Sequence, residues 1–354
     1  MNRDDVFSIA VAQLNSVPPA VPPDIVRRAI ADQYGLDVSL SPLPGERDLN
    51  FQATTPDGTR FALKIVNAHE TAEETALLTA IMTHVDTGDL PVAVVKRDRN
   101  GHADTVLAHA GATWRMRLVG WLDGTPLAEA PPALALCRDT GRQIARVALR
   151  LRSLDAGASA ARRRILWDSS RIDELADFAA HIADPQRRTH VLAFLDQFTS
   201  LRRTTIDGLR RQIIHNDYNA SNITVMTTDP ARVAGLVDFG DACEAPLVNE
   251  LAVAASYQMR APEGPIASLA AMTAAFHAVI ALTETEIEML VPLVRARLAT
   301  RIILSEWRAS LFPGNAVYIR RNLDKAVALF DHLHTLSDGP AQLHAALATE
   351  HAHP

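Results

Sequence analysis

The chain has 354 residues, of which 48% are hydrophobic and 21% charged, and its net charge is −6. This length allows a large core and predicts two domains or lobes, and the acidic balance argues against a nucleic-acid partner. The two cysteines, Cys137 and Cys243, lie far apart, which fits a reducing compartment. The N-terminus lacks a signal-peptide pattern, and the apolar stretch 266–282 is short for a membrane span. We therefore expect a cytoplasmic enzyme that does not enter a membrane.

The first third of the chain predicts a sheet-rich unit. After a proline-containing arm over residues 1–20, Asp24 is expected to cap a helix that ends at Gly35. The turn Pro56-Asp57-Gly58 predicts that the strands on its two sides pair as a hairpin. The expected strands cover residues 38–43, 50–54, 60–66, 90–95, 103–109 and 114–119, and a helix is expected over 70–85.

The turn from Gly45 to Asn50 joins the first two expected strands. Its backbone N–H groups are candidates for contact with phosphates, so Gly45 and Asn50 count as candidate nucleotide-site residues. One glycine is a weak signal, however, and the chain contains no Walker-type motif.

Lys64 stands inside an apolar strand pattern. Because an unpaired ammonium is costly to bury, the residue indicates either a contact with nucleotide phosphates, held by a helix carboxylate, or an exposed lysine on an edge strand. The candidate carboxylates are Glu70, Glu73 and Glu74, and we favour Glu74.

The chain becomes almost wholly helical after Pro131-Pro132. We therefore predict an α+β architecture with two unequal lobes. Residues 1–119 form the expected nucleotide-binding lobe, and residues 120–354 form the expected catalytic and substrate lobe. The histidine-containing tail, 351–354, is expected to fray rather than to bind a metal.

Two short apolar runs in this helical part deliver polar residues to turns. Asp217 and Asn222 follow the first run, and Asp238 follows the second. Phosphoryl transfer needs such a set: a carboxylate that accepts a hydroxyl proton, and oxygen ligands for Mg²⁺ on a nucleotide. His215 is expected to brace the loop. Asp and Asn are also common in ordinary turns, but the two flanked motifs together make chance a poor explanation.

The spacing after Asp238 argues against a protein substrate. Protein kinases carry a long activation segment at this point. Here Pro246 follows Gly240 by only six residues, and a helix is expected from Asn249. A small-molecule hydroxyl acceptor is therefore predicted.

On these residues the chain resembles the aminoglycoside phosphotransferase-like kinases, which share the protein-kinase fold, and it is most similar to their hydroxylysine-kinase-like branch. The resemblance covers about residues 24–322. Its motifs are Tyr34–Leu36, Gly45–Phe51, Ala62–Ile65, Arg117–Gly124, Trp167-Asp168, His215–Asn222, Asp238–Asp241, and Pro313 and Asn315 with Tyr318. One departure is Asn216, where aminoglycoside kinases commonly have glycine.

The resemblance implies a role for each motif. Asp217 would be the catalytic base, Asn222 and Asp238 the Mg²⁺ ligands, and Lys64 the contact to the phosphates of ATP or GTP. Backbone groups from Leu118 to Gly120 would hold the nucleobase.

The acceptor is suggested by charge. Asp241, Glu244 and Glu250 near the loop favour a cationic amine, although Asp241 alternatively caps a turn and Glu250 its own helix. Several arginines are candidates for a substrate carboxylate or, alternatively, for surface ion pairs. They are Arg295, Arg297, Arg301, Arg320 and Arg321. An amino alcohol or hydroxylated amino acid satisfies both hints. An aminoglycoside kinase of antibiotic resistance and a non-catalytic nucleotide-binding regulator stay open as alternatives.

Overall fold

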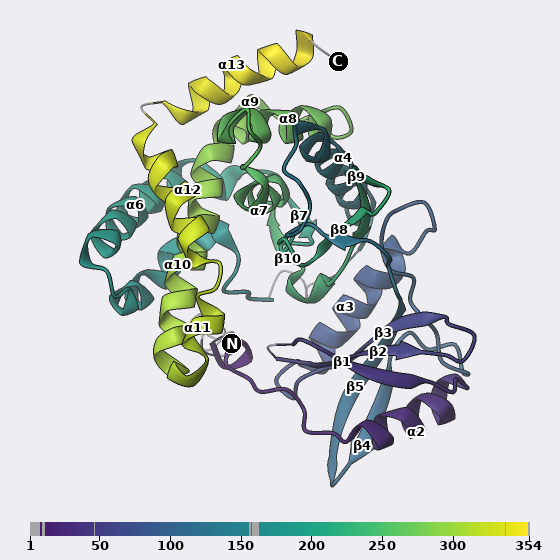
Figure 1. Cartoon of the computed structure of the whole chain (residues 1–354). Helices are drawn as coiled ribbons and strands as arrows, with labels where there is room; N and C mark the ends of the chain where they lie inside the picture. The colour runs from purple at the N-terminus through teal and green to yellow at the C-terminus, as the bar shows by residue number, and fades with distance from the viewer. Residues whose placement is uncertain are drawn as a thin grey trace. The chain divides into compact units, whose positions relative to one another are not determined.

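The computed structural model describes residues 8, 11–45, 47–155, 157, 163–336 and 338–352 (Figure 1). Much of the predicted arm, Glu46 of the predicted turn and the last two residues of the predicted tail lie outside these residues. The chain forms two compact units. The first unit contains residues 1–123, 154–164 and 235–240, and the second contains 124–153, 165–234 and 241–354. The first boundary thus falls four residues after the predicted one, and two later segments return to the first unit.

The first unit is built on an antiparallel sheet with the strand order β1-β2-β3-β5-β4. Its elements are α2 (Pro23–Tyr34), β1 (Ser39–Leu43), β2 (Leu49–Thr54), β3 (Arg60–Ile65), α3 (Ala72–Val85), β4 (Thr105–His109) and β5 (Ala112–Gly120). The predicted hairpin is confirmed, since Thr54 of β2 pairs with Arg60 of β3. The stop at Gly35 is also confirmed, because its φ of 71° is left-handed. Asp24 does not cap α2; it lies in the first turn and pairs with Arg28.

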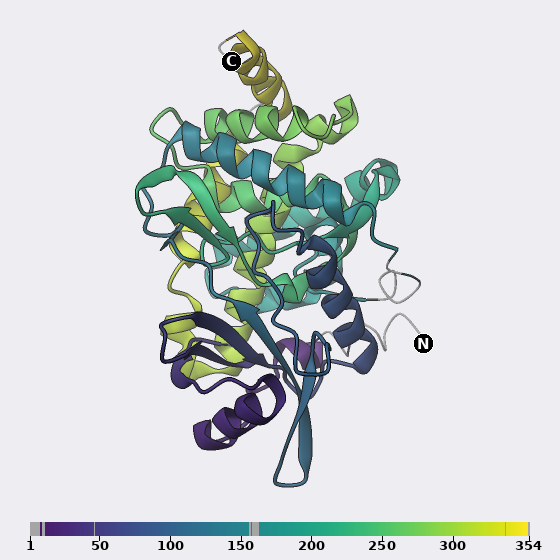
Figure 2. The same cartoon turned by 90° about the vertical axis from the view of Figure 1, so that its right-hand side faces the viewer.

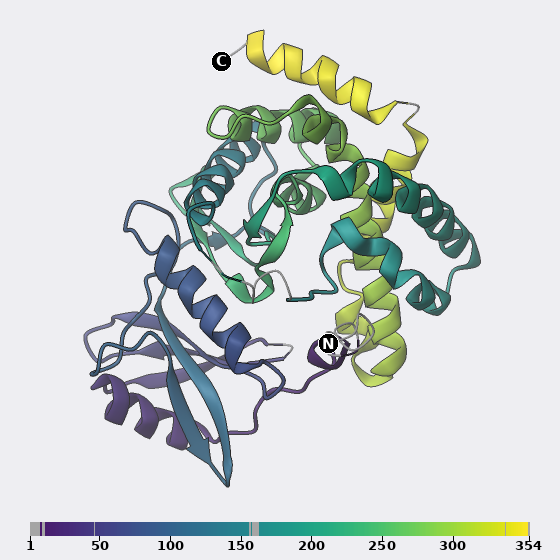
Figure 3. The same cartoon turned by 180° about the vertical axis from the view of Figure 1, so that it is seen from behind.

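Helices α2 and α3 cover opposite faces of the sheet, with α3 in front of the strands in Figure 3. Side chains alternate between the faces of a strand. Leu63 and Ile65 therefore join a hydrophobic core with Val26 of α2. Lys64 and Arg117 point to the other face, where Arg117 Nη2 donates to the backbone carbonyl of Thr75 in α3. This alternation places the predicted phosphate contact on the α3 face.

The predicted strand at 90–95 is wrong. In the structure this segment makes only isolated bridges, Val92 with Leu236 and Val95 with Val119. Val92 and Val95 are nevertheless buried, which explains why the apolar pattern was strand-like, whereas Val94 is 52% exposed.

The second unit is mostly helical. In Figure 2, α4 lies beside α8, and α8 also contacts α13. The helix predicted within 266–282 is confirmed as α8. The long α10 is buried along much of its length and contacts α7, η1 and α12. Among the described residues, none of the helices combines the length and apolarity that a membrane crossing requires.

The elements after the first boundary are β6 (Thr125–Pro126), α4 (Leu134–Leu151), η1 (Ser169–His181), α6 (Pro185–Thr204), η2 (Ile206–Gly208), β7 (Arg211–Ile214), β8 (Ile223–Met226), β9 (Asp229–Leu236), η3 (Phe239–Asp241), β10 (Cys243–Pro246), α7 (Asn249–Gln258), α8 (Pro265–His277), α9 (Glu284–Glu288), α10 (Leu290–Leu311), η4 (Pro313–Asn315), α11 (Ala316–Ile319), α12 (Leu323–Thr335) and α13 (Gly339–Ala352). The η elements are 3-10 helices. The segment 235–240, which returns to the first unit, takes the end of β9 and most of η3.

Candidate active site

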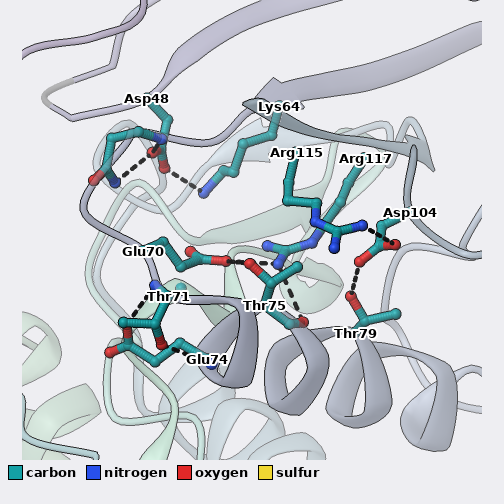
Figure 4. Close-up of polar contacts among 12 residues, drawn as sticks. Asp48, Lys64, Glu70, Thr71, Glu74, Thr75, Thr79, Asp104, Arg115 and Arg117 are labelled. Atoms are coloured by element: carbon teal, nitrogen blue, oxygen red, sulfur yellow. Dashed lines mark hydrogen bonds and ion pairs between the residues drawn. The ribbon is translucent and has the colours of Figure 1, made fainter. Parts of the chain in front are cut away.

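Lys64 lies between two carboxylates of the first unit. Its Nζ is 2.8 Å from Asp238 Oδ1 and 3.4 Å from Asp48 Oδ2; Figure 4 shows the contact with Asp48. Burial favours the neutral amine, but the two carboxylates outweigh it and raise the pKa of Lys64 above its usual range. Lys64 is therefore charged, as a phosphate contact requires.

Asp238 follows the end of β9 by two residues and has an unusual backbone conformation. Its φ is 66°, a left-handed value that costs energy for a residue with a side chain. Its Oδ1 accepts hydrogen bonds from Lys64 and from the Gly240 N–H. Although burial favours protonation, Lys64 holds the pKa of Asp238 below its usual range. The side chain is 44% exposed, so an ionised carboxylate is open to a cation.

The turn at Gly45 folds closely over itself. A Cβ on Gly45 would lie 2.4 Å from the Asp48 carbonyl oxygen, so no side chain fits there. Asn50 closes the turn by donating to the Pro44 carbonyl. Asp48 Oδ1 accepts from the Asn67 backbone and side chain at 2.9 and 3.0 Å. Asp48 is thus fixed beside Lys64, a role that the sequence analysis missed although the residue stands in the turn it singled out.

The structure does not bring Glu74 to Lys64. Glu74 starts α3 through a capping box with Thr71, and its carboxylate also accepts from Gln13 Nε2 at 2.8 Å. Arg163 Nε lies 3.5 Å from the same carboxylate. The predicted pairing is therefore corrected, because these nearer donors occupy Glu74 and because Asp48 and Asp238 pair with Lys64.

Glu70, another candidate partner of Lys64, pairs instead with Arg117. The Arg117 Nη2 to Glu70 Oε1 distance is 2.7 Å, and Thr75 Oγ1 donates to the same oxygen at 2.8 Å (Figure 4). Arg117 stands directly opposite Lys64 in the sheet and is 4% exposed. A buried guanidinium needs a carboxylate, so Glu70 neutralises Arg117 rather than Lys64.

The nucleobase contacts at Leu118 and Gly120 stay a prediction, although one backbone group of each residue bonds within the first unit. The Gly120 N–H donates to the Val94 carbonyl at 2.8 Å, and the Leu118 carbonyl accepts from the Lys96 N–H at 2.9 Å. These backbone groups are already used within the first unit.

Asp217 is the centre of the loop in the second unit. Its Oδ1 accepts from Arg297 Nη2 at 2.9 Å. Its Oδ2 accepts from Asn219 Nδ2 at 2.9 Å and from Asn222 Nδ2 at 2.8 Å. The carboxylate is 19% exposed. Its position is thus fixed by several donors, while an edge stays open to a small molecule.

The side chains of His215 and Glu250 accept hydrogen bonds from backbone N–H groups of this loop. His215 Nδ1 accepts the Asp217 N–H at 3.2 Å, which confirms the predicted bracing, and its ring stacks on Tyr218. The fully buried Glu250 accepts the N–H groups of His215 and Asn216 at 2.8 and 3.2 Å. Glu250 therefore caps the loop rather than its own helix. Burial raises the pKa of Glu250 to about 8.

Asn216 explains the one departure from the aminoglycoside kinase pattern. Its φ is 64°, a region that glycine and asparagine occupy more readily than other residues. Both residue types therefore fit the same backbone.

Arg297 is the residue of this loop environment whose role the sequence analysis missed. It is 1% exposed, its Nη1 donates to the Trp167 carbonyl at 2.8 Å, and its guanidinium lies 5.1 Å from the Trp167 ring centre. It is one of the arginines considered for a substrate carboxylate, but the structure commits it to Asp217. Eighty residues separate the two in sequence, so no local pattern announces the pair.

The two acidic residues predicted to contact a substrate amine differ in exposure, since the side chain of Glu244 is 38% exposed. Asp241 is buried at 7% exposure. Glu244 lies on β10 with its Oε1 3.8 Å from Arg211 Nε.

Comparisons with known proteins agree with this geometry. The model of the phosphotransferase enzyme family matches residues 39–284. The hydroxylysine kinase of Xenopus laevis is 26% identical over 350 residues, which are 93% of this chain and 93% of that protein. Two solved structures resemble the chain. The amicoumacin kinase hAmiN in complex with AMP-PNP, Ca2+ and Ami has a TM-score of 0.65 at 13% identity, covering 91% of this chain and 96% of that one. The microcompartment-associated aminopropanol kinase has a TM-score of 0.63 at 16% identity, covering 91% and 100%.

These structural likenesses confirm the predicted fold class. The chain has mixed helices and antiparallel sheet in two lobes, as kinases of this fold do.

Proposed function

The chain belongs to the phosphotransferase enzyme family, and from that premise we propose that it transfers the γ-phosphate of ATP or GTP to a hydroxyl group of a hydroxylated amino acid or an amino alcohol. Small-molecule phosphotransfer to a hydroxyl is the activity that its family and relatives share. A hydroxylysine kinase aligns along almost the whole chain, and an aminopropanol kinase has a similar fold. Both names denote acceptors with an amine and a hydroxyl, which favours this class.

The observation that carries the proposal is the fixed, partly exposed carboxylate of Asp217. Arg297 holds one oxygen, and Asn219 and Asn222 hold the other. A carboxylate in this state can orient a hydroxyl group and take its proton as the phosphoryl group is transferred. Because the transition state of phosphoryl transfer needs little covalent help, positioning supplies most of the acceleration.

We assign Mg²⁺ binding to Asn222 and Asp238. Asn222 uses its Nδ2 on Asp217, which leaves the Oδ1 end of the amide for a hard cation. Asp238 is ionised and open to solvent. An ion held by these two residues would take its further ligands from phosphate and water. When bound, the ion would neutralise charge on the β- and γ-phosphates. Lys64 is the proposed protein contact to the α- and β-phosphates.

The segment after Gly240 supports a small acceptor. It forms the short strand β10 and then enters α7 at Asn249. Too few residues lie between Gly240 and the start of α7 to form the peptide-docking segment that protein kinases carry at this point.

An acceptor panel tests the proposal. ADP or GDP release is measured with ATP or GTP and Mg²⁺ in the presence of hydroxylysine, aminopropanol or an aminoglycoside. We expect turnover with the first two acceptors and none when Mg²⁺ is chelated. Turnover with the aminoglycoside alone would replace the proposed acceptor class. An absence of transfer to every acceptor would favour a nucleotide-binding regulator.

A further inference from the structure

We propose that Arg301 binds the carboxylate of the acceptor, so that the enzyme prefers a hydroxylated amino acid to an amino alcohol; this deepens, and rests on, the proposed function. The residues that support this proposal all belong to the second unit: Asp217, Tyr257, Arg297 and Arg301.

Arg301 and Arg297 leave α10 on the same face. Residues four positions apart in a helix are neighbours, about 6 Å apart along the axis. Arg297 is committed to Asp217 at 2.9 Å. Arg301 is therefore the next cation along the helix from the candidate base, and Asp217 and Arg297 are close enough to influence its ionisation in opposite directions.

Arg301 contacts an aromatic ring and neutral backbone carbonyls. Its guanidinium lies 4.1 Å from the Tyr257 ring centre, which fixes its plane. Its hydrogen bonds go to neutral backbone carbonyls, those of Ser256 at 3.3 Å and Asn322 at 3.5 Å. Within the described part of the chain, it forms no ion pair with a carboxylate.

Arg297 and Arg320 differ from Arg301 because each of them is already paired with a carboxylate. Arg297 is 1% exposed and bonded to Asp217, so a ligand cannot reach it. Arg320 is paired with Glu306 at 2.7 Å. Arg301 is only partly buried, yet burial still lowers its pKa. A half-desolvated guanidinium gains from a carboxylate, which accepts two parallel hydrogen bonds from it.

The test compares two acceptors in one variant. Arg301→Gln and wild type are assayed with hydroxylysine and with its decarboxylated analogue, which keeps the hydroxyl and both amines. We expect the variant to lose about 10- to 100-fold in kcat/KM for hydroxylysine, mainly through KM, as the loss of a charged hydrogen bond does. The value for the analogue should not change.

Arg295→Gln is the matched control. Arg295 lies on the same helix and stacks on Phe194, with its guanidinium 4.6 Å from the ring centre, but it faces His334 rather than Arg297. We expect this variant to keep the wild-type preference for the carboxylated acceptor.

The outcomes separate the inference from the proposed function. If wild type phosphorylates hydroxylysine but Arg301→Gln weakens both acceptors equally, Arg301 is structural and the inference is overturned alone. The same conclusion follows if wild type does not prefer the carboxylated acceptor. If wild type phosphorylates no hydroxylated amine, the proposed function fails and the inference fails with it.

Discussion

The two units compensate the charges of their candidate site residues in opposite ways. In the first unit one ammonium, Lys64, stands between the carboxylates of Asp48 and Asp238. In the second unit one carboxylate, Asp217, is held by a guanidinium and two side-chain amides. The first arrangement is a set of ion pairs that a phosphate and a cation can replace, whereas the second is complete before any ligand arrives. We therefore expect nucleotide binding to exchange ionic partners and acceptor binding to use a preformed base.

The largest effect is expected at the preformed base. Asp217→Asn keeps an oxygen for Arg297 but cannot take a proton, so kcat should fall by at least ~100-fold while nucleotide affinity stays the same. Coupled ADP release and nucleotide titration measure the two quantities. Asp177→Asn, an exposed carboxylate of the same unit, serves as control. Near-normal turnover in Asp217→Asn would contradict its role as base.

The exchangeable half should respond in nucleotide affinity instead. Lys64→Met removes the charge that meets the phosphates and leaves Asp48 and Asp238 without their cation. We expect the Kd for ATP to rise about 10- to 100-fold, measured by titration with a fluorescent nucleotide. Lys325→Met, an exposed lysine of α12, should leave the Kd unchanged. Equal affinities of Lys64→Met and wild type would remove Lys64 from the nucleotide site.

The support under the loop predicts a pH dependence of stability. Glu250 has a pKa of about 8 when folded and 4.5 when unfolded. Between these values the folded state holds a proton that the unfolded state has lost, so Glu250 makes the free energy of unfolding fall as pH rises. Glu250→Gln removes this pH dependence, because glutamine does not titrate, and it removes one acceptor of a backbone N–H. The free energy of unfolding should therefore fall by about 1–2 kcal/mol near pH 5.

Urea unfolding of both proteins between pH 5 and about 9 measures this difference. The stability gap between wild type and Glu250→Gln should narrow as pH rises. Parallel profiles would show that Glu250 is ionised throughout.

The smallest effect concerns the backbone at Asn216. Its side-chain amide has no hydrogen-bond partner among the described residues, and replacement by alanine or by glycine removes it alike, so the difference between the two variants reports the φ of 64°. Asn216→Ala should lower the free energy of unfolding by about 0.5–1 kcal/mol, and Asn216→Gly should change it little. Chemical denaturation checks both. Equal stability of the two variants would mean that the backbone relaxes out of the left-handed region.

Local patterns predicted most of the fold. The turn at Pro56–Gly58 and the stop at Gly35 each depend on residues adjacent in sequence, and both are confirmed. The prediction of a strand over 90–95 was wrong because its two buried valines, Val92 and Val95, make only isolated bridges and do not join a ladder. Periodicity reports burial and does not distinguish these cases.

The polar partners of the site were harder to predict. The motif residues Asp217, Asn222 and Asp238 could be chosen from spacing, but Arg297 and Glu250 reach the loop from distant helices. Glu74 was favoured among three helix carboxylates as the partner of Lys64. Its actual partners include Gln13, 61 residues away, and such competition between donors is decided only when the chain is folded.

The pair of Arg117 and Glu70 constrains how this sequence can change over time. Both side chains are largely buried, with exposures of 5% and 13%, so replacing either one alone strands a charge in the interior. Replacing both together removes the charges at once. Substitutions at these two positions are therefore coupled, and a lineage that loses Arg117 is expected to lose Glu70 nearly simultaneously.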